Sequence, residues 1–414
     1  MRHPVSIVAA LAVLTITATS CTGPTPNDGS GRGPITFVRG KDISGKSPPM
    51  LDRWNRFHPD ERVTLVELPE KADDQRSQLV QYAQARSDRF DVLALDVVWT
   101  AEFAARQWIV PLDGAGINTS RLLRSAADTG VYQGHRYAVP SNTNAAFLYY
   151  RKDLVPIPPK TWKELIDDCA IARRHNIGCY AGQYAQYEGL TVNVSEAVHS
   201  AGGEIVGNDG KDVLVDSAEA RSGLGFLVDG FRLGYIPPEA ITYKEEESRR
   251  AFQQGRLLFL RNWPYVYGRA SEPGSDSVVQ GRFGVAPIPG EKGIGKSTLG
   301  GANLAVSEFS RHQKTAVDFI KYLTGDWAQR YMLREMSVAP TLAALYDDPE
   351  LRQQRPYLLM LKQALRDAQP RPATPYYNEV TLAIQRAAYR ALQGQETVDA
   401  AVREMADRLR RAGS

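Results

Sequence analysis

The first third of the chain alternates between two hydrophobic periods. Short runs rich in β-branched residues predict strands, and segments with apolar residues three and four positions apart predict amphipathic helices. The order is strand, helix, strand, helix, strand and a short helix, at 35–39, 48–59, 62–68, 73–87, 90–98 and 100–107. This βαβαβ order is typical of a mostly parallel sheet, in which ligands bind beyond the carboxyl ends of the strands.

The pattern beyond residue 144 predicts a second α/β unit and a helical C-terminal part. Helices are expected at 161–174, 191–201, 217–232 and 245–255, and strands at 256–263, 283–290 and 300–310. Five further helices are expected at 313–325, 326–336, 355–368, 377–394 and 397–413. Because 414 residues are enough for two domains, we expect two α/β lobes with chain crossings near 140–146 and 300–305.

Asp96 stands out because it ends the buried apolar run of the third expected strand. A buried carboxylate without a partner is destabilising, so a group should meet Asp96 at the strand tip. That group is either a ligand or the backbone N–H groups of the following helix, which Asp96 would then cap. Both interpretations are compatible with the local sequence.

The N-terminus has the parts of an export signal. Arg2 precedes an uncharged apolar run over 4–20, and the small residues 18–20 stand directly before Cys21. These residues resemble the lipobox of bacterial lipoproteins, in which the cysteine is lipidated. A plain signal peptide and a membrane anchor are the alternatives, although the run is shorter than the about 20 residues of a spanning helix.

We therefore expect a signal peptide at 1–20, lipidation of Cys21 and a flexible tether at 21–34, which is rich in Gly, Pro and polar residues. The folded body would then be anchored on the outer face of the cell membrane. In such an oxidising compartment Cys169 and Cys179, ten residues apart, are expected to form a disulfide. Two free buried thiols are the alternative.

Charge and motifs exclude several function classes. The chain has 50 Lys and Arg against 47 Asp and Glu, interspersed without a basic stripe, so nucleic acid is not an expected partner. The sequence has no GxSxG or HExxH motif, and its His residues lack metal-ligand spacing. We expect no enzyme, metal or cofactor; the enzymatic alternative is a glycosidase that uses Asp96 and Glu245 as its carboxylate pair.

Several segments together resemble ABC-importer solute-binding proteins of the carbohydrate class. They are "WNRFHPDERVTL", "YAVPSNTNAAFLYYRKDL", "AFQQGRLLFLRNWPYVYG", "GGANLAVSEFS" and "AVDFIKYLTG". More specific motifs resemble the trehalose-binding lipoproteins of actinobacterial trehalose-recycling importers; they are "ALDVVWTAEFA", "DQRSQL", "NWP", "GGANLAV" and "RPATPYY". The resemblance covers nearly the whole mature chain.

The resemblance implies an α/β, two-lobed periplasmic-binding-protein fold of type II, similar to maltose-binding protein, with a hinge and a ligand cleft between the lobes. Lobe I would contain residues 35–143 and 304–365, and lobe II residues 144–303 and 366–414. The expected function is that of a monomeric receptor that closes over a disaccharide and delivers it to an ABC permease. Trehalose is the first candidate for this disaccharide. Alternatives are another α-glucoside such as maltose, or a lipoprotein scaffold that binds no sugar.

The resemblance also implies a set of ligand-binding residues, which are Asp42, Gln75, Asp96, Asn144, Glu245, Trp263, Gly301 and Arg371. Carboxylate, amide and guanidinium groups pair with vicinal sugar hydroxyls, and aromatic rings pack on the apolar face of a pyranose. Trp263, Trp99 and Tyr377 are the aromatic candidates. Structural alternatives exist: Trp263 and Trp99 can fill the core, Asn144 can satisfy hinge backbone groups, and Arg371 can pin its loop to a carboxylate.

Overall fold

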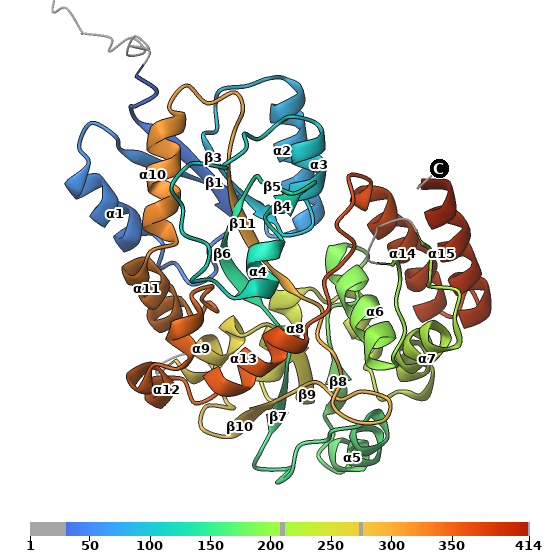
Figure 1. Ribbon diagram of the computed structural model, residues 1–414. Coiled ribbons are helices and arrows are strands. Elements are labelled where there is room, and N and C mark those ends of the chain that lie inside the picture. Colours follow the sequence, from blue (N-terminus) through green and yellow to red (C-terminus); the bar gives the residue numbers. More distant parts are fainter. Residues whose placement is uncertain (1–29, 208–211, 273–275, 413–414) are drawn as a thin grey trace, which may run out of the picture.

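The computed structural model describes residues 30–207, 212–272 and 276–412, which fold into two α/β lobes (Figure 1). The signal peptide expected at 1–20, the lipidation candidate Cys21 and most of the tether lie outside the described residues. Within the described ranges, no helix is both long and apolar enough to cross a bilayer.

The first lobe is built on a five-stranded sheet with the order β2-β1-β3-β11-β6. Its strands are β1 Ile35–Gly40, β2 Val63–Leu68, β3 Val92–Asp96, β6 Val139–Asn144 and β11 Gly300–Val306. β1 is parallel to β2 and β3, whereas β11 is antiparallel to β3 and β6. The predicted βαβαβ start is therefore confirmed, and Asp96 ends β3 next to Ala302 of β11.

Helices of the first lobe cover this sheet (Figure 1). They are α1 Pro48–Phe57, α2 Ala72–Gln84, α3 Thr100–Ala105, α4 Arg124–Asp128, α10 Gln313–Leu323 and α11 Asp326–Met336. α1 buries Met50, Leu51 and Trp54, the apolar stripe that predicts it, and the Trp54 ring packs on Phe319 of α10. A short hairpin of β4 Val131–Tyr132 and β5 His135–Arg136 was not expected from the pattern.

The second lobe contains a four-stranded sheet with the order β10-β7-β9-β8. Its strands are β7 Phe147–Arg151, β8 Gly178–Ala181, β9 Leu257–Asn262 and β10 Phe283–Ala286. Its helices are α5 Trp162–Arg174, α6 Glu188–Ser200, α7 Ala218–Leu233, α8 Glu245–Gln253 and α9 Tyr265–Ser271, with a 3-10 turn η1 Pro238–Thr242. Local chemistry sets these ends, because Thr161 and Glu164 form a capping box at α5 and Gly234 ends α7 at φ 77°.

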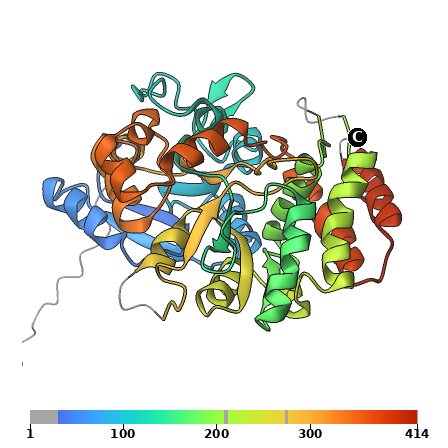
Figure 2. The ribbon, with the colours of Figure 1, turned by 90° about the horizontal axis from the view of Figure 1, so that it is seen from below.

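The C-terminal helices return to the second lobe. Helices α14 Tyr377–Leu392 and α15 Val398–Ala412 pack beside α6 and α7, and Figure 2 shows these helices gathered at one side of the molecule. Between α11 and α14 the chain forms η2 Ala343–Tyr346, α12 Pro349–Gln354 and α13 Leu358–Asp367.

Three chain segments cross between the lobes, and hydrogen bonds hold them side by side. The first crossing is the buried pair Ala145 and Ala146 between β6 and β7, and the Ala146 N–H donates to the Ser297 hydroxyl at 2.7 Å. The third crossing lies in the segment 368–376 between α13 and α14, and the second crossing, residues 297–299, pairs with it through a bridge between Thr298 and Gln369. The crossings therefore place the end of β6 and the start of β11 in the first sheet next to the start of β7 in the second sheet.

The crossings correct the expected lobe boundaries. Asn144 belongs to β6 and pairs with Gly300, and β11 starts at Gly300. Residues 144 and 300–303 therefore lie in the first sheet and not in lobe II. The sequence pattern placed the second boundary late because it shows where a strand is and not which sheet the strand joins.

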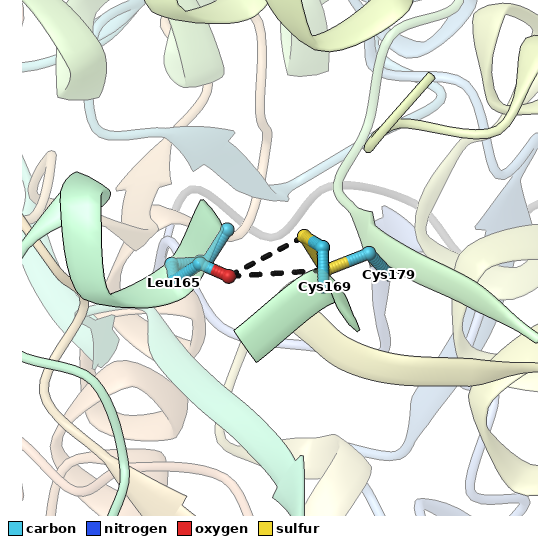
Figure 3. The surroundings of a disulfide bond; sticks show 3 residues. All are labelled: Leu165, Cys169 and Cys179. Carbon is cyan, nitrogen blue, oxygen red and sulfur yellow. Dashed lines mark hydrogen bonds between the residues drawn. A yellow bond between two sulfur atoms is a disulfide. The ribbon is translucent and has the colours of Figure 1, made fainter. Parts of the chain in front are cut away.

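A disulfide links Cys169 of α5 to Cys179 of β8 (Figure 3). The two Cα atoms are 5.2 Å apart, and both side chains are buried. The Leu165 carbonyl oxygen lies 3.3 Å from the sulfur of Cys169 and 3.9 Å from that of Cys179. The bridge ties a helix to the neighbouring edge strand of the second sheet.

Removing this disulfide is expected to lower the stability of the second lobe. Closing a loop of this length contributes about 2–3 kcal/mol by restricting the unfolded chain. Thermal unfolding with and without dithiothreitol should therefore show a lower midpoint under reduction. A Cys169→Ser, Cys179→Ser variant serves as the control, because its midpoint should be low and should not respond to the reductant; an equal response in both proteins contradicts the prediction.

Candidate functional site

A cavity of about 230 Å³ lies between the two lobes. Both lobes contribute to its walls, because the loop after β1 and the end of β6 face α8, α9 and the end of β9 across it. The lining residues are Arg39, Lys41, Asp42, Ile43, Ser44, Glu70, Gln75, Asn142, Asn144, Lys244, Glu245, Glu246, Trp263, Tyr265, Arg269, Met336 and Val338. The walls combine charged and amide groups with two aromatic rings and few aliphatic side chains.

Five of the eight expected ligand residues line this cavity: Asp42, Gln75, Asn144, Glu245 and Trp263. They come from five separate elements of both lobes. The other three, Asp96, Gly301 and Arg371, do not line it, although Asp96 and Arg371 are bonded to each other.

Asp42 and Gln75 lie on the lobe I wall, Asp42 in the loop after β1 and Gln75 in the first turn of α2. Each side chain bonds to the backbone of a neighbouring loop. The Asp42 carboxylate accepts hydrogen bonds from the backbone N–H groups of Ser44 and Ser47, at 2.9 and 2.7 Å. Burial acts to raise the pKa of Asp42, but the bonds from Ser44 and Ser47 outweigh it and leave the pKa lowered. The Gln75 amide donates to the carbonyl groups of Pro69 and Glu70 at 2.8 and 3.2 Å.

Trp263 follows β9 and presents a half-buried indole to the cavity. The guanidinium of Arg261 lies 4.2 Å from the ring centroid, and a buried ion pair with Glu196 at 2.6 Å holds that guanidinium. On the lobe I side the ring approaches Gly300, where a Cβ atom would lie 3.2 Å from the indole. The backbone at Gly300 thus makes room for the aromatic wall.

Glu245 is the first residue of α8, and its carboxylate accepts a hydrogen bond from the Tyr187 hydroxyl at 2.7 Å. Burial raises the pKa of Glu245, and the bond from Tyr187 opposes the shift. Local sequence alone favours a solvated helix start here, because "KEEESRR" is strongly charged. The tertiary structure instead turns this carboxyl into the cavity.

Asp96 and Arg371 form an ion pair of 2.8 Å next to a second carboxylate. The other terminal nitrogen of Arg371 lies 2.5 Å from Glu188 at the start of α6. Asp96 also accepts from the N–H of Val98 at 3.2 Å, but α3 starts only at Thr100, so Asp96 closes a turn and does not cap that helix. Arg371 lines a separate, mostly apolar cavity of about 250 Å³ near α3 and α4.

Gly301 has a backbone role in the structure. Its φ of +130° is unfavourable for other residues, and a Cβ atom would lie 2.4 Å from the carbonyl oxygen of Asn142. The Gly301 carbonyl accepts from the Val97 N–H at 3.3 Å. Gly301 thus allows β6 and β11 to approach each other behind the cavity.

Burial contradicts the expectation that Trp99 and Tyr377 pack against the ligand. Trp99 is 3% exposed and belongs to the core of the first lobe. The alternative that Trp99 fills the core is therefore correct. Tyr377 is 1% exposed, and its hydroxyl donates to Glu188 at 2.5 Å. Neither ring has a free face for a sugar, so Trp263 is the aromatic candidate that lines the cavity.

Sequence reasoning missed several residues of the cavity and of the ion-pair network. Asn142 could have been found, because it lies two residues before Asn144 on the same face of β6. Tyr265 follows the "NWP" motif and could have been found in the same way. Arg39, Lys244 and Glu188 carry no local signal, since each stands in a segment that reads as an ordinary strand or helix end.

The described residues contain no cluster of three or more His, Cys, Asp or Glu side chains that could hold a metal ion. What the cavity offers is a ring of hydrogen-bonding groups and an aromatic wall, divided between two lobes. Such a site can bind an uncharged polar molecule and can close around it.

Known proteins resemble this chain over most of its length. The family described as bacterial extracellular solute-binding protein matches residues 41–330. A probable ABC transporter-binding protein of Deinococcus radiodurans is 33% identical over 367 residues, which cover 84% of this chain and 86% of the relative.

Solved structures extend the likeness to the fold. Maltose-bound MalE3 of T. maritima has a TM-score of 0.86 at 33% identity and covers 91% of this chain and 99% of its own. The GacH receptor of Streptomyces glaucescens GLA.O, solved unliganded and with acarbose, has a TM-score of 0.83 at 24% identity, with coverages of 92% and 98%. This chain therefore belongs to the bacterial extracellular solute-binding proteins and has their two-lobed, type II, maltose-binding-protein-like fold.

Proposed function

We propose that this protein captures an α-linked glucose disaccharide, trehalose before maltose, and delivers it to the permease of an ABC importer. Family membership supports the coarser role of an extracytoplasmic solute-binding component of a sugar importer. The choice of trehalose rests on the specific motifs of the sequence, including "ALDVVWTAEFA" and "RPATPYY". The maltose named with the structural neighbour supports an α-glucoside as the wider class.

The single observation that carries the proposal is the composition of the inter-lobe cavity. Its hydrogen-bonding groups and the Trp263 ring come from both lobes. Hydrogen bonds to these groups and one stacking contact favour binding, and the entropy of association opposes it. We expect a micromolar dissociation constant, which corresponds to about −8 kcal/mol. Because the ligand contacts are divided between the lobes, sugar binding favours the closed arrangement.

The glycosidase alternative is less well supported by the geometry. The Asp96 carboxylate is ion-paired with the permanently charged Arg371, and the Glu245 carboxylate accepts a hydrogen bond from Tyr187. A glycosidase needs one carboxyl group that donates a proton and a second one that is free to attack or to activate water. We infer binding without hydrolysis.

The disaccharide proposal predicts saturable binding without turnover. Isothermal titration calorimetry should give a dissociation constant near 10⁻⁶ M, to within about tenfold, for trehalose or maltose. Incubation with each sugar should release no glucose by a coupled enzymatic assay. Glucose release would favour the glycosidase, and the absence of heat with all disaccharides of a panel would exclude the proposed function.

Trp263→Ala is expected to weaken disaccharide binding about tenfold, because it removes an aromatic face worth roughly 1.4 kcal/mol. The matched control is Trp327→Ala, since Trp327 is a half-exposed indole on α11 that does not line the cavity. Calorimetry should show unchanged affinity in the control. Equal losses of affinity in both variants would remove Trp263 from the site.

We also propose that a lipid on Cys21 anchors the protein to the outer face of the cell membrane. The apolar run before Cys21 and the small residues 18–20 support this anchoring. The prediction is that Cys21→Ser moves the protein from the membrane to the soluble fraction after cell lysis, as followed by immunoblotting. Retention of the variant in the membrane fraction would favour an uncleaved anchor in place of the lipid.

A further inference from the structure

A buried charged network joins the two lobes beside the third crossing, and its centre is Glu188. This first residue of α6 is only 5% exposed. Its carboxylate accepts hydrogen bonds from Arg371 at 2.5 Å, Tyr377 at 2.5 Å and Thr381 at 2.7 Å. Its backbone N–H donates to Asp73 of α2 at 3.0 Å, so Glu188 is held from both lobes.

Arg371 is almost completely buried, and each of its terminal nitrogens bonds to a carboxylate of the protein. Its side chain is 2% exposed, and its terminal nitrogens bond to Glu188 and Asp96. Its Nε is buried and has no hydrogen-bond partner among the described residues. Burial alone disfavours the charged guanidinium, but Asp96, Tyr377 and Glu188 outweigh it and leave the pKa of Arg371 raised. Arg371 is therefore a permanent cation whose main contacts are two carboxylates.

Asp96 is the member of this network that meets solvent, with its side chain 21% exposed. It lies beside the cavity, because Ala302 of β11 pairs with Asp96 on one side and with the cavity residue Asn142 on the other. One carboxylate oxygen, Oδ1, accepts from both Arg371 and the Val98 N–H. The other oxygen, Oδ2, has no hydrogen-bond partner among the residues that the structure describes. A carboxylate held through one oxygen presents the other in a fixed direction, as recognition of a hydroxyl group requires.

We propose that Glu188 is a positioning residue of the sugar site: it fixes Arg371, Arg371 fixes Asp96, and the oriented Asp96 carboxylate accepts a sugar hydroxyl. This inference rests on the proposed function. It also changes the role of Arg371 from a ligand contact to a positioning residue. Because Asp96 is in lobe I and Glu188 is in lobe II, the same chain of contacts ties the orientation of Asp96 to the relative position of the lobes.

A purely structural network predicts different behaviour from a positioning network. In the structural case, loss of the Glu188 charge lowers stability and leaves the affinity for sugar unchanged. In the positioning case, loss of the Glu188 charge weakens sugar binding because Asp96 is no longer held in its orientation. The effects of substituting Glu188 and Asp96 on the affinity are then not additive, and a double-mutant cycle measures this.

The test is calorimetric titration of trehalose and maltose into the full mature protein and three variants: Glu188→Gln, Asp96→Asn and the double variant. Glu188→Gln keeps the shape of the side chain but removes its charge. We expect its dissociation constant to rise at least tenfold over that of the wild type. In the Asp96→Asn background, the same change should raise the dissociation constant less than threefold.

The matched control is Asp91→Asn, because Asp91 is another buried carboxylate, 6% exposed, at the opposite end of β3. It bonds to the Ser310 hydroxyl at 2.5 Å and the Thr36 N–H at 2.7 Å, and it does not line the cavity. Its variant should lower the thermal midpoint without a change in affinity. Circular dichroism confirms that each variant is folded.

Several outcomes would overturn the inference. Affinity of folded Glu188→Gln within twofold of the wild type, or equal losses in the wild-type and Asp96→Asn backgrounds, would leave Glu188 with a structural role only. If the wild type binds no disaccharide, the proposed function fails first and this inference fails with it. The two failures are distinguishable, because the first is seen in the variants and the second in the wild type.

Discussion

The constraint on which the site depends is that a buried guanidinium must be surrounded by carboxylates. Arg371 lies in the third crossing, and its two ion pairs reach Asp96 in lobe I and Glu188 in lobe II. An unpaired charge at such depth would be strongly destabilising, so the arrangement is stable only when both lobes supply their partners. Three elements therefore form one unit: the end of β3 with Asp96, the start of α6 with Glu188, and the third crossing with Arg371.

Backbone pairing between the crossings completes this unit. The bond from Ala146 to Ser297 and the bridge between Thr298 and Gln369 align three connections that are far apart in the sequence. Two of the three crossings lead directly into strands of the first sheet or out of them, so the ends of β6 and β11 face α8 and Trp263 of the other lobe. The fold thus produces a cavity with walls from two bodies that are joined by three chain crossings, an arrangement that suits hinge closure.

The lobe interface also shows how carboxylate groups serve different purposes in the same protein. Asp42 uses its carboxylate to close a loop of the wall, Asp96 has one oxygen committed to an ion pair, and Glu245 is bonded to a tyrosine hydroxyl. Each is a carboxylate near the lobe interface, but the number of acceptor sites left open differs. What a ligand meets is therefore set by the contacts of each side chain and not by its charge alone.

Sequence by itself determined the order of elements, because hydrophobic periods are local properties. The βαβαβ start and the C-terminal helices follow from them. It also assembled five cavity residues, but only through the likeness of motifs such as "NWP" and "DQRSQL". Tertiary structure alone decided that Trp99 and Tyr377 are buried, that Gly301 serves the backbone, and that Glu188 partners Arg371, 183 residues away. The physical reason is that burial and ion pairing depend on which distant segments meet, and a local pattern carries no record of that meeting.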